Sequence, residues 1–461
     1  MHVRQNIWTI NPDPTVRDSI VEAYATAVSV MRERSRVNPQ DPTGWLYQSA
    51  RHDTGPAGIV PPGSSKEQCQ HGSWYFLAWH RMYLYFFERI ARQAVIEANG
   101  PADFALPYWD YSSGAPGSAL PYPFRIPADE DVNALYVASP RRYQPVNDGV
   151  PLDATITRIK EAMDAPIFAG TIPGFGGVED KPRAHFGRTT GLLEGTPHNA
   201  VHREVGRGGG LMGDPATAAL DPIFWLHHAN IDRLWNKWRQ AGHANSAKPG
   251  WLNERFQFHD ERGDLQSLAV SDVLESATQL DYVYDDDQGA FAMPIPEQLP
   301  ERRQPLELVG ASDESVTLRG QAIQAEVRVP EQLNEMVTER NRAPGQVVLA
   351  LEEITVDREP EDVYAVYLND RGAEPGADRF YVGNLALFGV RQAMDENEDA
   401  DGPRGVRELF DISSQARELA QQGRWDFREI TVTLEPVGFA AENPSPNPIP
   451  IHIGRIGLYL G

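Results

Sequence analysis

Histidine is concentrated in a few aromatic-rich segments of this chain. The clustered histidines are His71 and His80 in one region, and His198, His202, His227 and His228 in a second. Neutral imidazole nitrogens suit copper, and an aromatic surrounding keeps bulk water away from a bound metal. These segments therefore predict a buried copper site.

The spacing of the histidines limits how they can share metal ions. His198 and His202 are four residues apart, so a helix would place both on one face, where they could bind a single ion. The later pair His227-His228 offers a third ligand, and spacing does not choose between its two members. We therefore expect one three-histidine site in this region.

A second site is expected around the earlier histidines. His71 and His80 are nine residues apart, which is too far along an ideal helix for one ion. Either a helix break near Gly72 or a position of His71 in a loop would bring them together, and His52, upstream in its own loop, could be the third ligand. Two copper ions held close together could use dioxygen and exchange two electrons with a substrate. The remaining histidines, which we interpret as surface residues or residues behind the ligands, are His2, His185, His243, His259 and His452.

Helices are expected to position these ligands. Apolar periodicity predicts helices over 16–37, from about residue 69 or 71 to 97, around 198–205 and around 221–239. Prolines then mark a linker, and the later sequence alternates like short strands separated by turns, which is typical of a β-sandwich of about 150 residues. We predict a mainly α catalytic domain at 1–290, a Pro-rich linker at 291–305 and an all-β sandwich at 306–461.

Composition narrows the classes of partner. The 461 residues carry a formal net charge of -23, which disfavours nucleic acid and anionic membranes as partners. Cys69 is the single cysteine, so no intramolecular disulfide can form; with no apolar leader, this predicts a cytoplasmic protein. No stretch is long and apolar enough to span a bilayer.

The two histidine-rich segments resemble a known family. His71 to Glu88 and Asp221 to Trp235 are similar to the two copper-binding signatures of the type 3 copper proteins, which include tyrosinases, catechol oxidases and haemocyanins. The second signature, Asp-Pro-x-Phe-x-x-His-His-x-x-x-Asp-x-x-Trp, is long and specific. The resemblance implies a four-helix bundle around two copper ions, with dioxygen as co-substrate. It assigns copper A to His52, His71 and His80, and copper B to His198, His202 and His228.

The resemblance extends over nearly the whole chain. Tyr282-Val-Tyr284 is similar to the paired-tyrosine motif that closes the catalytic domain, and Arg4 stands where the family has an N-terminal arginine. The C-terminal part resembles the β-domain of plant polyphenol oxidases, which implies that it covers the copper site. The loop from Gly438 could then supply a plug, with Phe439 as the expected side chain.

Residues beside the ligands receive roles from the same resemblance. Cys69 is expected to form a thioether with His71; the alternative is a buried free thiol. Glu194 and Asn199 are expected to orient a water that deprotonates a phenol, whose pKa is about 10; the alternative is a loop carboxylate and a helix-start asparagine. Met212 and Pro215 are expected at the entrance, where a proline in place of a bulky residue leaves it open.

The function expected from the sequence is therefore a tyrosinase-type phenol oxidase. Its partners would be small phenols, with a separate copper chaperone as a further candidate. A catechol oxidase or o-aminophenol oxidase without monophenol hydroxylation is the alternative within the class. An oxygen carrier of haemocyanin type is the alternative from another class.

Overall fold

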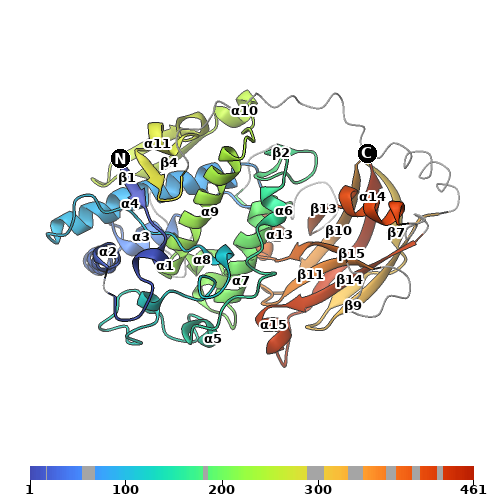
Figure 1. The fold of residues 1–461 in the computed structure, drawn as a ribbon, viewed down its shortest axis with the longest axis horizontal. Helices are drawn as coiled ribbons and strands as arrows, with labels where there is room; N and C mark the ends of the chain where they lie inside the picture. The colour runs from blue at the N-terminus through green and yellow to red at the C-terminus, as the bar shows by residue number, and fades with distance from the viewer. Residues whose placement is uncertain are drawn as a thin grey trace.

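The chain forms a helical N-terminal part and a β-sheet C-terminal part that lie side by side (Figure 1). This computed structural model describes residues 1–16, 18–53, 68–179, 185–287, 306–330, 346–369, 380–396, 405–422 and 429–461. The predicted linker at 291–305 lies outside the described residues, so the predicted domain limits at 290 and 306 stay predictions. Within the described ranges, no helix is long and apolar enough to cross a membrane.

Three long helices dominate the N-terminal part, and shorter ones connect them. The helices are α1 (Ile7–Ile10), α2 (Ser19–Val37), α3 (Trp45–Ala50), α4 (Phe76–Glu97), α5 (Gln144–Asn147), α6 (Lys160–Met163), α7 (Ala200–Val205), α8 (Pro215–Ala218), α9 (Ile223–Gln240), α10 (Pro249–Leu252) and α11 (Ser276–Gln279). The short strands are β1 (His2–Arg4), β2 (Ala169–Gly170), β3 (Gly177–Val178), β4 (Arg255–His259), β5 (Leu265–Ala269) and β6 (Tyr282–Tyr284). The helical class is therefore as predicted.

Helices α2, α4 and α9 pack in sequence, α2 against α4 and α4 against α9. Helix α2 begins where the Asp18 side chain accepts a hydrogen bond from the Ile20 amide at 2.8 Å, which satisfies one free N–H of the first turn. It buries an apolar stripe that includes Tyr24, Val28 and Met31. Since α7 has six residues, a regular four-helix bundle around the site stays a prediction.

Two of the predicted histidine-bearing helices begin later in the chain than expected. Helix α4 begins at Phe76, and His71 instead forms an isolated β-bridge with Phe186. Gly72, with a φ of 59°, turns the chain between the bridge and the helix, and a Cβ there would lie 2.7 Å from the Gly187 carbonyl oxygen. Of the two expected alternatives, a helix break near Gly72 or a position of His71 outside the helix, the structure shows the second. Likewise, α7 follows an irregular turn over Glu194–Asn199 and begins only at Ala200.

Arg4 connects the ends of the helical part. Strand β1 pairs in parallel with β6, which places Arg4 opposite Tyr284. The fully buried guanidinium donates to Glu88 of α4 at 2.8 Å and to Asp232 of α9 at 3.2 Å. Its Cζ also lies 3.7 Å from the centre of the Tyr282 ring. Arg4 and the tyrosine pair thus tie together the two signature helices, α4 and α9.

The C-terminal part is a single nine-stranded sheet, so the expected sandwich of two sheets is wrong in this respect. Its strands are β7 (Glu307–Ser312), β8 (Val316–Leu318), β9 (Ile323–Arg328), β10 (Val347–Val356), β11 (Val363–Asn369), β12 (Phe380–Leu385), β13 (Val406–Asp411), β14 (Glu429–Val437) and β15 (Ile451–Leu460). Their order is β12-β11-β14-β9-β7-β15-β10-β13, with β8 on β15. The described helices of this part are α13 (Val390–Glu396), α14 (Ser413–Gln421) and α15 (Phe439–Glu442).

This sheet curls into a nearly closed barrel. Strands β12 and β13, at the two ends of the order, contact each other. Gly383 makes the approach possible, because a Cβ there would lie 2.6 Å from the Phe410 ring. Strict alternation of apolar residues predicts one buried face per strand but does not distinguish a curled single sheet from two stacked sheets.

Polar contacts join the two parts. Arg203 and Arg207 of the helical part pair with Glu359 at 3.3 Å and with Asp362 at 2.9 Å. The Phe439 amide donates to Glu204 at 2.9 Å. In the helical part these contacts lie in or next to α7, and in the β domain they lie at the start of β11 and the end of β14. The β domain is therefore anchored beside the second histidine region.

Candidate metal centre

The histidine-rich segments form two compact clusters of potential ligands. One contains His52, Cys69, His71 and His80, and the other contains His198, His202, His227 and His228; within each, the ligand atoms lie within 4.8 Å of one another. All eight residues are at most 3% exposed. The structure thus brings together every histidine assigned to a copper site from the sequence.

Three separate segments build the first cluster. His52 follows α3, His71 lies in the bridge, and His80 lies in the second turn of α4. Backbone carbonyls hold two of the rings: Nδ1 of His52 is 2.8 Å from the Pro215 oxygen, and Nδ1 of His80 is 2.9 Å from the Phe76 oxygen. A carbonyl can only accept, so each Nδ1 carries the proton, which leaves a lone pair on Nε2.

Two helices and the turn before α7 build the second cluster. His198 ends the irregular turn and directs Nδ1 to Oδ1 of Asn199 at 2.8 Å. His202 in α7 directs Nδ1 to the Met212 oxygen at 2.9 Å. The same tautomer, with a lone pair on Nε2, follows for both rings.

The Nε2 atoms fit a metal. Within the described part of the chain, the buried Nε2 atoms of five rings have no hydrogen-bond partner: His52, His71, His80, His198 and His227. Burial lowers the pKa of His52 to about 4 and that of His198 to about 3, so both rings are neutral near pH 7. Copper coordination requires neutral imidazoles with free lone pairs. Without a metal, each buried nitrogen that lacks a hydrogen-bond partner would destabilise the folded protein.

His227 and His228 differ in their surroundings. Nε2 of His228 lies 3.4 Å from Nε2 of His202, and the His228 ring stacks on His80 with centroids 4.6 Å apart. His228 therefore faces both clusters. The His227 ring packs between His198, at 5.3 Å, and Tyr111, at 5.6 Å. The His227 ring also lies 4.8 Å from His202, and neither of its nitrogens has a hydrogen-bond partner among the described residues. His228 as the third ligand, with His227 behind it, therefore stays a prediction.

Cys69 lies at the first cluster, as its place in the sequence predicts. Its Sγ is 3.6 Å from Nδ1 of His71. Burial raises the pKa of the thiol well above its ordinary value. His185 is buried and lies behind the first cluster, the second of the two positions expected for it. Its Nδ1 lies 2.7 Å from the Cys69 oxygen, and its own carbonyl accepts the His71 amide at 3.0 Å.

Glu194 and Asn199 line a small pocket together with His71. Glu194 is 2% exposed and accepts the Gly72 amide at 2.7 Å, and burial raises its pKa to about 8. Asn199 stands at the start of α7, as the alternative expected, but its side chain makes no capping hydrogen bond. Its oxygen instead orients His198, which leaves the amide nitrogen for another partner.

Met212 and Pro215 lie next to the ligands but not at an open entrance. Both are buried, and each contributes a backbone oxygen that orients a histidine. Gly389 of the β domain lies close to Pro215, since a Cβ on Gly389 would approach the Pro215 ring to 3.2 Å. The expectation that a proline leaves the entrance open is therefore corrected for this closed arrangement.

The β domain places Phe388, and not the predicted Phe439, against the histidines. Phe439 packs on Tyr143, with centroids 5.2 Å apart, and does not contact the histidines. Phe388, between β12 and α13, stacks on His202 at 4.2 Å and lies 5.8 Å from both His71 and His198. The segment Ala386-Leu-Phe-Gly389 continues an apolar strand and carries no local signal, so only the docking of the two parts identifies it.

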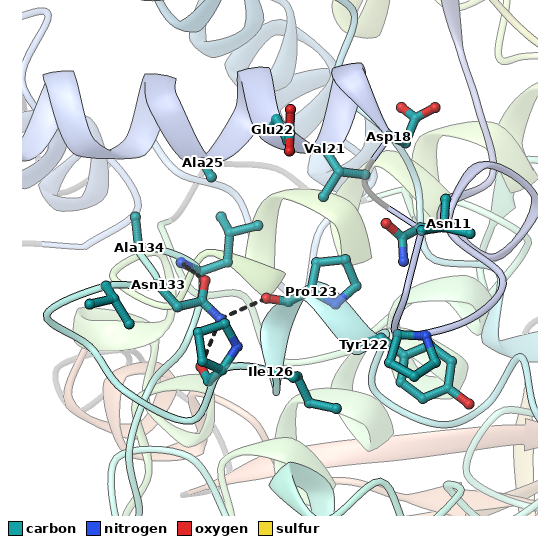
Figure 2. A pocket seen from close by; sticks show the side chains of 15 residues that line it. Asn11, Asp18, Val21, Glu22, Ala25, Tyr122, Pro123, Ile126, Asn133 and Ala134 are labelled. Carbon is teal, nitrogen blue, oxygen red and sulfur yellow. Dashed lines mark hydrogen bonds between the residues drawn. The ribbon is translucent and has the colours of Figure 1, made fainter.

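Glu408 of β13 is a further residue that the sequence does not reveal. Its carboxylate lines the same small pocket and accepts from Thr190 at 3.0 Å. Burial raises its pKa to about 7. A different pocket, on the surface between the start of α2 and residues 122–135, contains Asp18 and Glu22 but no histidine (Figure 2). That surface pocket is therefore separate from the metal centre.

Three comparisons with known proteins agree with this geometry. The family described as "Common central domain of tyrosinase" matches residues 42–150 and 153–241, and the "Polyphenol oxidase middle domain" matches 245–293. A domain of unknown function matches 305–461. Tyrosinase HcTyr1 of Hahella sp. is 33% identical over 100% of this chain and 99% of its own length.

More distant relatives cover different shares of the chain. Polyphenol oxidase B, chloroplastic, of Solanum lycopersicum is 31% identical over 58% of this chain and 47% of its own length, so the matched region is about half of that protein. The structure of latent apple tyrosinase covers 100% of this chain and 97% of its own, with a TM-score of 0.65 and 22% identity, and shows the shared fold. From the full-length match and the histidine clusters together, the chain belongs to the tyrosinase and polyphenol oxidase family of type 3 copper oxidoreductases.

Proposed function

We propose that this chain is a dicopper phenol oxidase of the tyrosinase type. The observation that carries the proposal is the convergence of buried Nε2 atoms without hydrogen-bond partners in two adjacent clusters. His52, His71 and His80 would hold one copper ion, and His198, His202 and His228 the other. When bound, the pair of ions supplies two-electron exchange with dioxygen and substrate.

The proposed reactions balance as follows. Two o-diphenols each lose two protons and two electrons to become o-quinones, while one dioxygen becomes two water molecules. One monophenol and one dioxygen give one o-quinone and one water. The protein must accept the phenolic proton, because a phenol with a pKa of about 10 is a poor metal ligand until it is ionised.

Glu194 and Asn199 support monophenol hydroxylation over catechol oxidation alone. Both line the small pocket beside His71, and both are at most 2% exposed. A water between the Glu194 carboxylate and the Asn199 amide would accept the phenolic proton. A catechol oxidase or o-aminophenol oxidase would not depend on this pair to the same degree.

The test is copper reconstitution of the full chain, followed by assays with a tyrosine-like and a catechol-like substrate. Glu194→Gln should lower the monophenol rate far more than the diphenol rate. Asn199→Asp keeps an oxygen facing Nδ1 of His198 but removes the amide N–H donor, so it tests the proposed water site while the orientation of His198 is kept. An unchanged ratio of the two rates in both variants would contradict the proposed role of Glu194 and Asn199. Oxidation of the catechol with no reaction of the monophenol in the parent chain would identify a catechol oxidase. Reversible oxygen binding without oxidation of catechol would identify a carrier.

We also propose that the β domain keeps the enzyme latent. Phe388 lies against His202, and the domain is anchored by the ion pairs of Arg203 and Arg207. Substrate needs the space that this side chain fills. Cleavage between residues 288 and 305 should therefore raise activity, and unchanged activity after complete cleavage would contradict latency. A copper chaperone and a cytoplasmic location stay predictions.

A further inference from the structure

A second cavity lies behind the loop that orients two of the histidines. It has a volume of about 480 Å³ and is formed by α2, the start of α3, the segment around residues 130–141, and the two ends of the loop 211–220. A cavity of this size is in the range of small-molecule sites. It contains no histidine, so it is separate from the metal centre.

The walls of the cavity are mostly apolar. Leu46, Val137, Leu211 and Leu220 supply aliphatic surface, and Trp45 and Tyr136 supply aromatic surface. Apolar walls with few polar groups favour a ligand with an apolar body. The size and the aromatic residues suit a single aromatic ring.

The charged groups of the cavity are mainly arginines, although the whole chain has a net charge of -23. Arg36 is held by Glu33 and Arg141 by Glu130. Arg32 differs, because no carboxylate among the described residues lies within ion-pair distance of it. Its guanidinium lies over the Trp45 ring, 5.6 Å from the centroid, and burial lowers its pKa.

Arg32 is therefore a half-buried cation at the wall of an apolar cavity. Its N–H groups form no ion pair with a carboxylate among the described residues. A guanidinium presents paired N–H groups that match the two oxygens of a carboxylate. We propose that this cavity binds a small aromatic monocarboxylate, with the carboxylate on Arg32 and the ring against the apolar wall.

The cavity adjoins the backbone that sets the metal ligands. Leu211 is next to Met212, whose carbonyl orients His202, and Pro215 within the same loop orients His52. Two hydrogen bonds hold the backbone of Leu211. Its amide donates to the Arg141 carbonyl oxygen at 2.7 Å, and its carbonyl accepts from the Thr217 hydroxyl at 2.8 Å. A ligand against Leu211 and Leu220 would thus press on a loop that touches one histidine of each cluster.

The direct test is calorimetric binding of 3-phenylpropanoate to the copper-loaded full chain. We expect a Kd on the order of 0.1 mM. Arg32→Met should weaken binding by about tenfold or more, because a charge-assisted contact is lost. The neutral analogue 3-phenylpropanamide should bind weakly and should not distinguish the variant from the parent. Octanoate is the comparison for a flexible alkyl body, and tighter binding of octanoate would overturn the aromatic assignment.

Two further variants keep the test decisive. Leu46→Trp fills the cavity and leaves Arg32 in place, so it should also abolish binding while the melting temperature confirms a folded protein. Arg328→Met removes the same charge from an exposed position on the β domain, where the side chain is 53% exposed, and should have no effect. Equal binding by Arg32→Met and the parent, or equal weakening by Arg328→Met, would overturn the proposal. The result does not depend on the phenol oxidase activity.

Discussion

The two histidine clusters are equally buried but differ in what surrounds their ligands. The first draws its histidines from three separate segments and includes the sulfur of Cys69, 3.6 Å from His71. The second has one histidine more than a triad needs and is covered by Phe388, 4.2 Å from His202. We infer from this difference that ligand orientation is reinforced at the first cluster and access is controlled at the second.

The largest expected effect separates the adjacent histidines of the second cluster. His228→Gln should lose about one of the two bound copper ions and lower activity by more than about 100-fold. His227→Gln should keep both ions, because its ring packs between His198 and Tyr111. Copper content by atomic absorption gives the answer, and the reverse pattern would show that the ligand assignment is wrong.

A thioether between Cys69 and His71 would distinguish the first cluster from the second. If a C–S bond forms between the Cys69 sulfur and a ring carbon of His71, two protons and two electrons are lost, with dioxygen as the oxidant at the loaded centre. The copper-loaded protein should then be lighter by two hydrogen atoms, and Cys69→Ser should show no such change. Copper affinity of Cys69→Ser should fall about 10–100-fold. A full-mass protein whose thiol reacts after denaturation would contradict the thioether.

Phe388 tests the cover over the second cluster. Phe388→Ala should raise the activity of the uncleaved chain by about tenfold, which corresponds to about 1.4 kcal/mol less stabilisation of the closed arrangement. Phe439→Ala, a matched change on the same domain, removes a ring that contacts Tyr143 and should leave activity low. Diphenol oxidation rates measure both. Activation by Phe439→Ala alone would restore the original assignment of the plug.

The smallest expected effect is the pH dependence of stability that Glu408 causes where the helical part meets the β domain. The folded-state pKa of Glu408 is raised to about 7 by burial. Its contribution to stability is therefore complete below its ordinary pKa of 4.5 and is lost as pH rises through about 7.

Glu408→Gln should remove this dependence. Its melting temperature should exceed that of the parent by roughly 2–4 °C near pH 8 and by less near pH 5. The histidines, whose pKa values are lowered, change stability with pH in the opposite direction. Because they are present in both proteins, their contribution cancels when the two are compared at the same pH. If the two proteins differ in melting temperature by the same amount at pH 5 and at pH 8, Glu408 is ionised in the folded protein across this range, and the prediction is wrong.

The sequence predicts the two histidine clusters because the spacing of these residues is local and histidine is rare in the chain. His198 and His202 share a helical spacing, and the long signature around His228 is specific. Arg4 and the pair Tyr282 and Tyr284 were also placed correctly, and they meet at Asp232 as buried polar groups must when they need partners.

The features that escaped prediction depend on backbone atoms and on docking. The carbonyls of Met212 and Pro215 orient His202 and His52, yet no side-chain pattern reveals a carbonyl direction. Phe388 lies on an ordinary apolar segment and becomes important only because two parts of the chain meet there. The curl of the β domain similarly depends on the approach of β12 to β13, which strand periodicity does not encode.

We propose that two histidine triads hold two copper ions. The most direct measurement is an anomalous difference map at the copper absorption edge from crystals of the copper-loaded full chain. We predict two peaks, one bonded to Nε2 of His52, His71 and His80, and one to Nε2 of His198, His202 and His228. A single peak, or a second peak bonded to His227 in place of His228, would contradict this account.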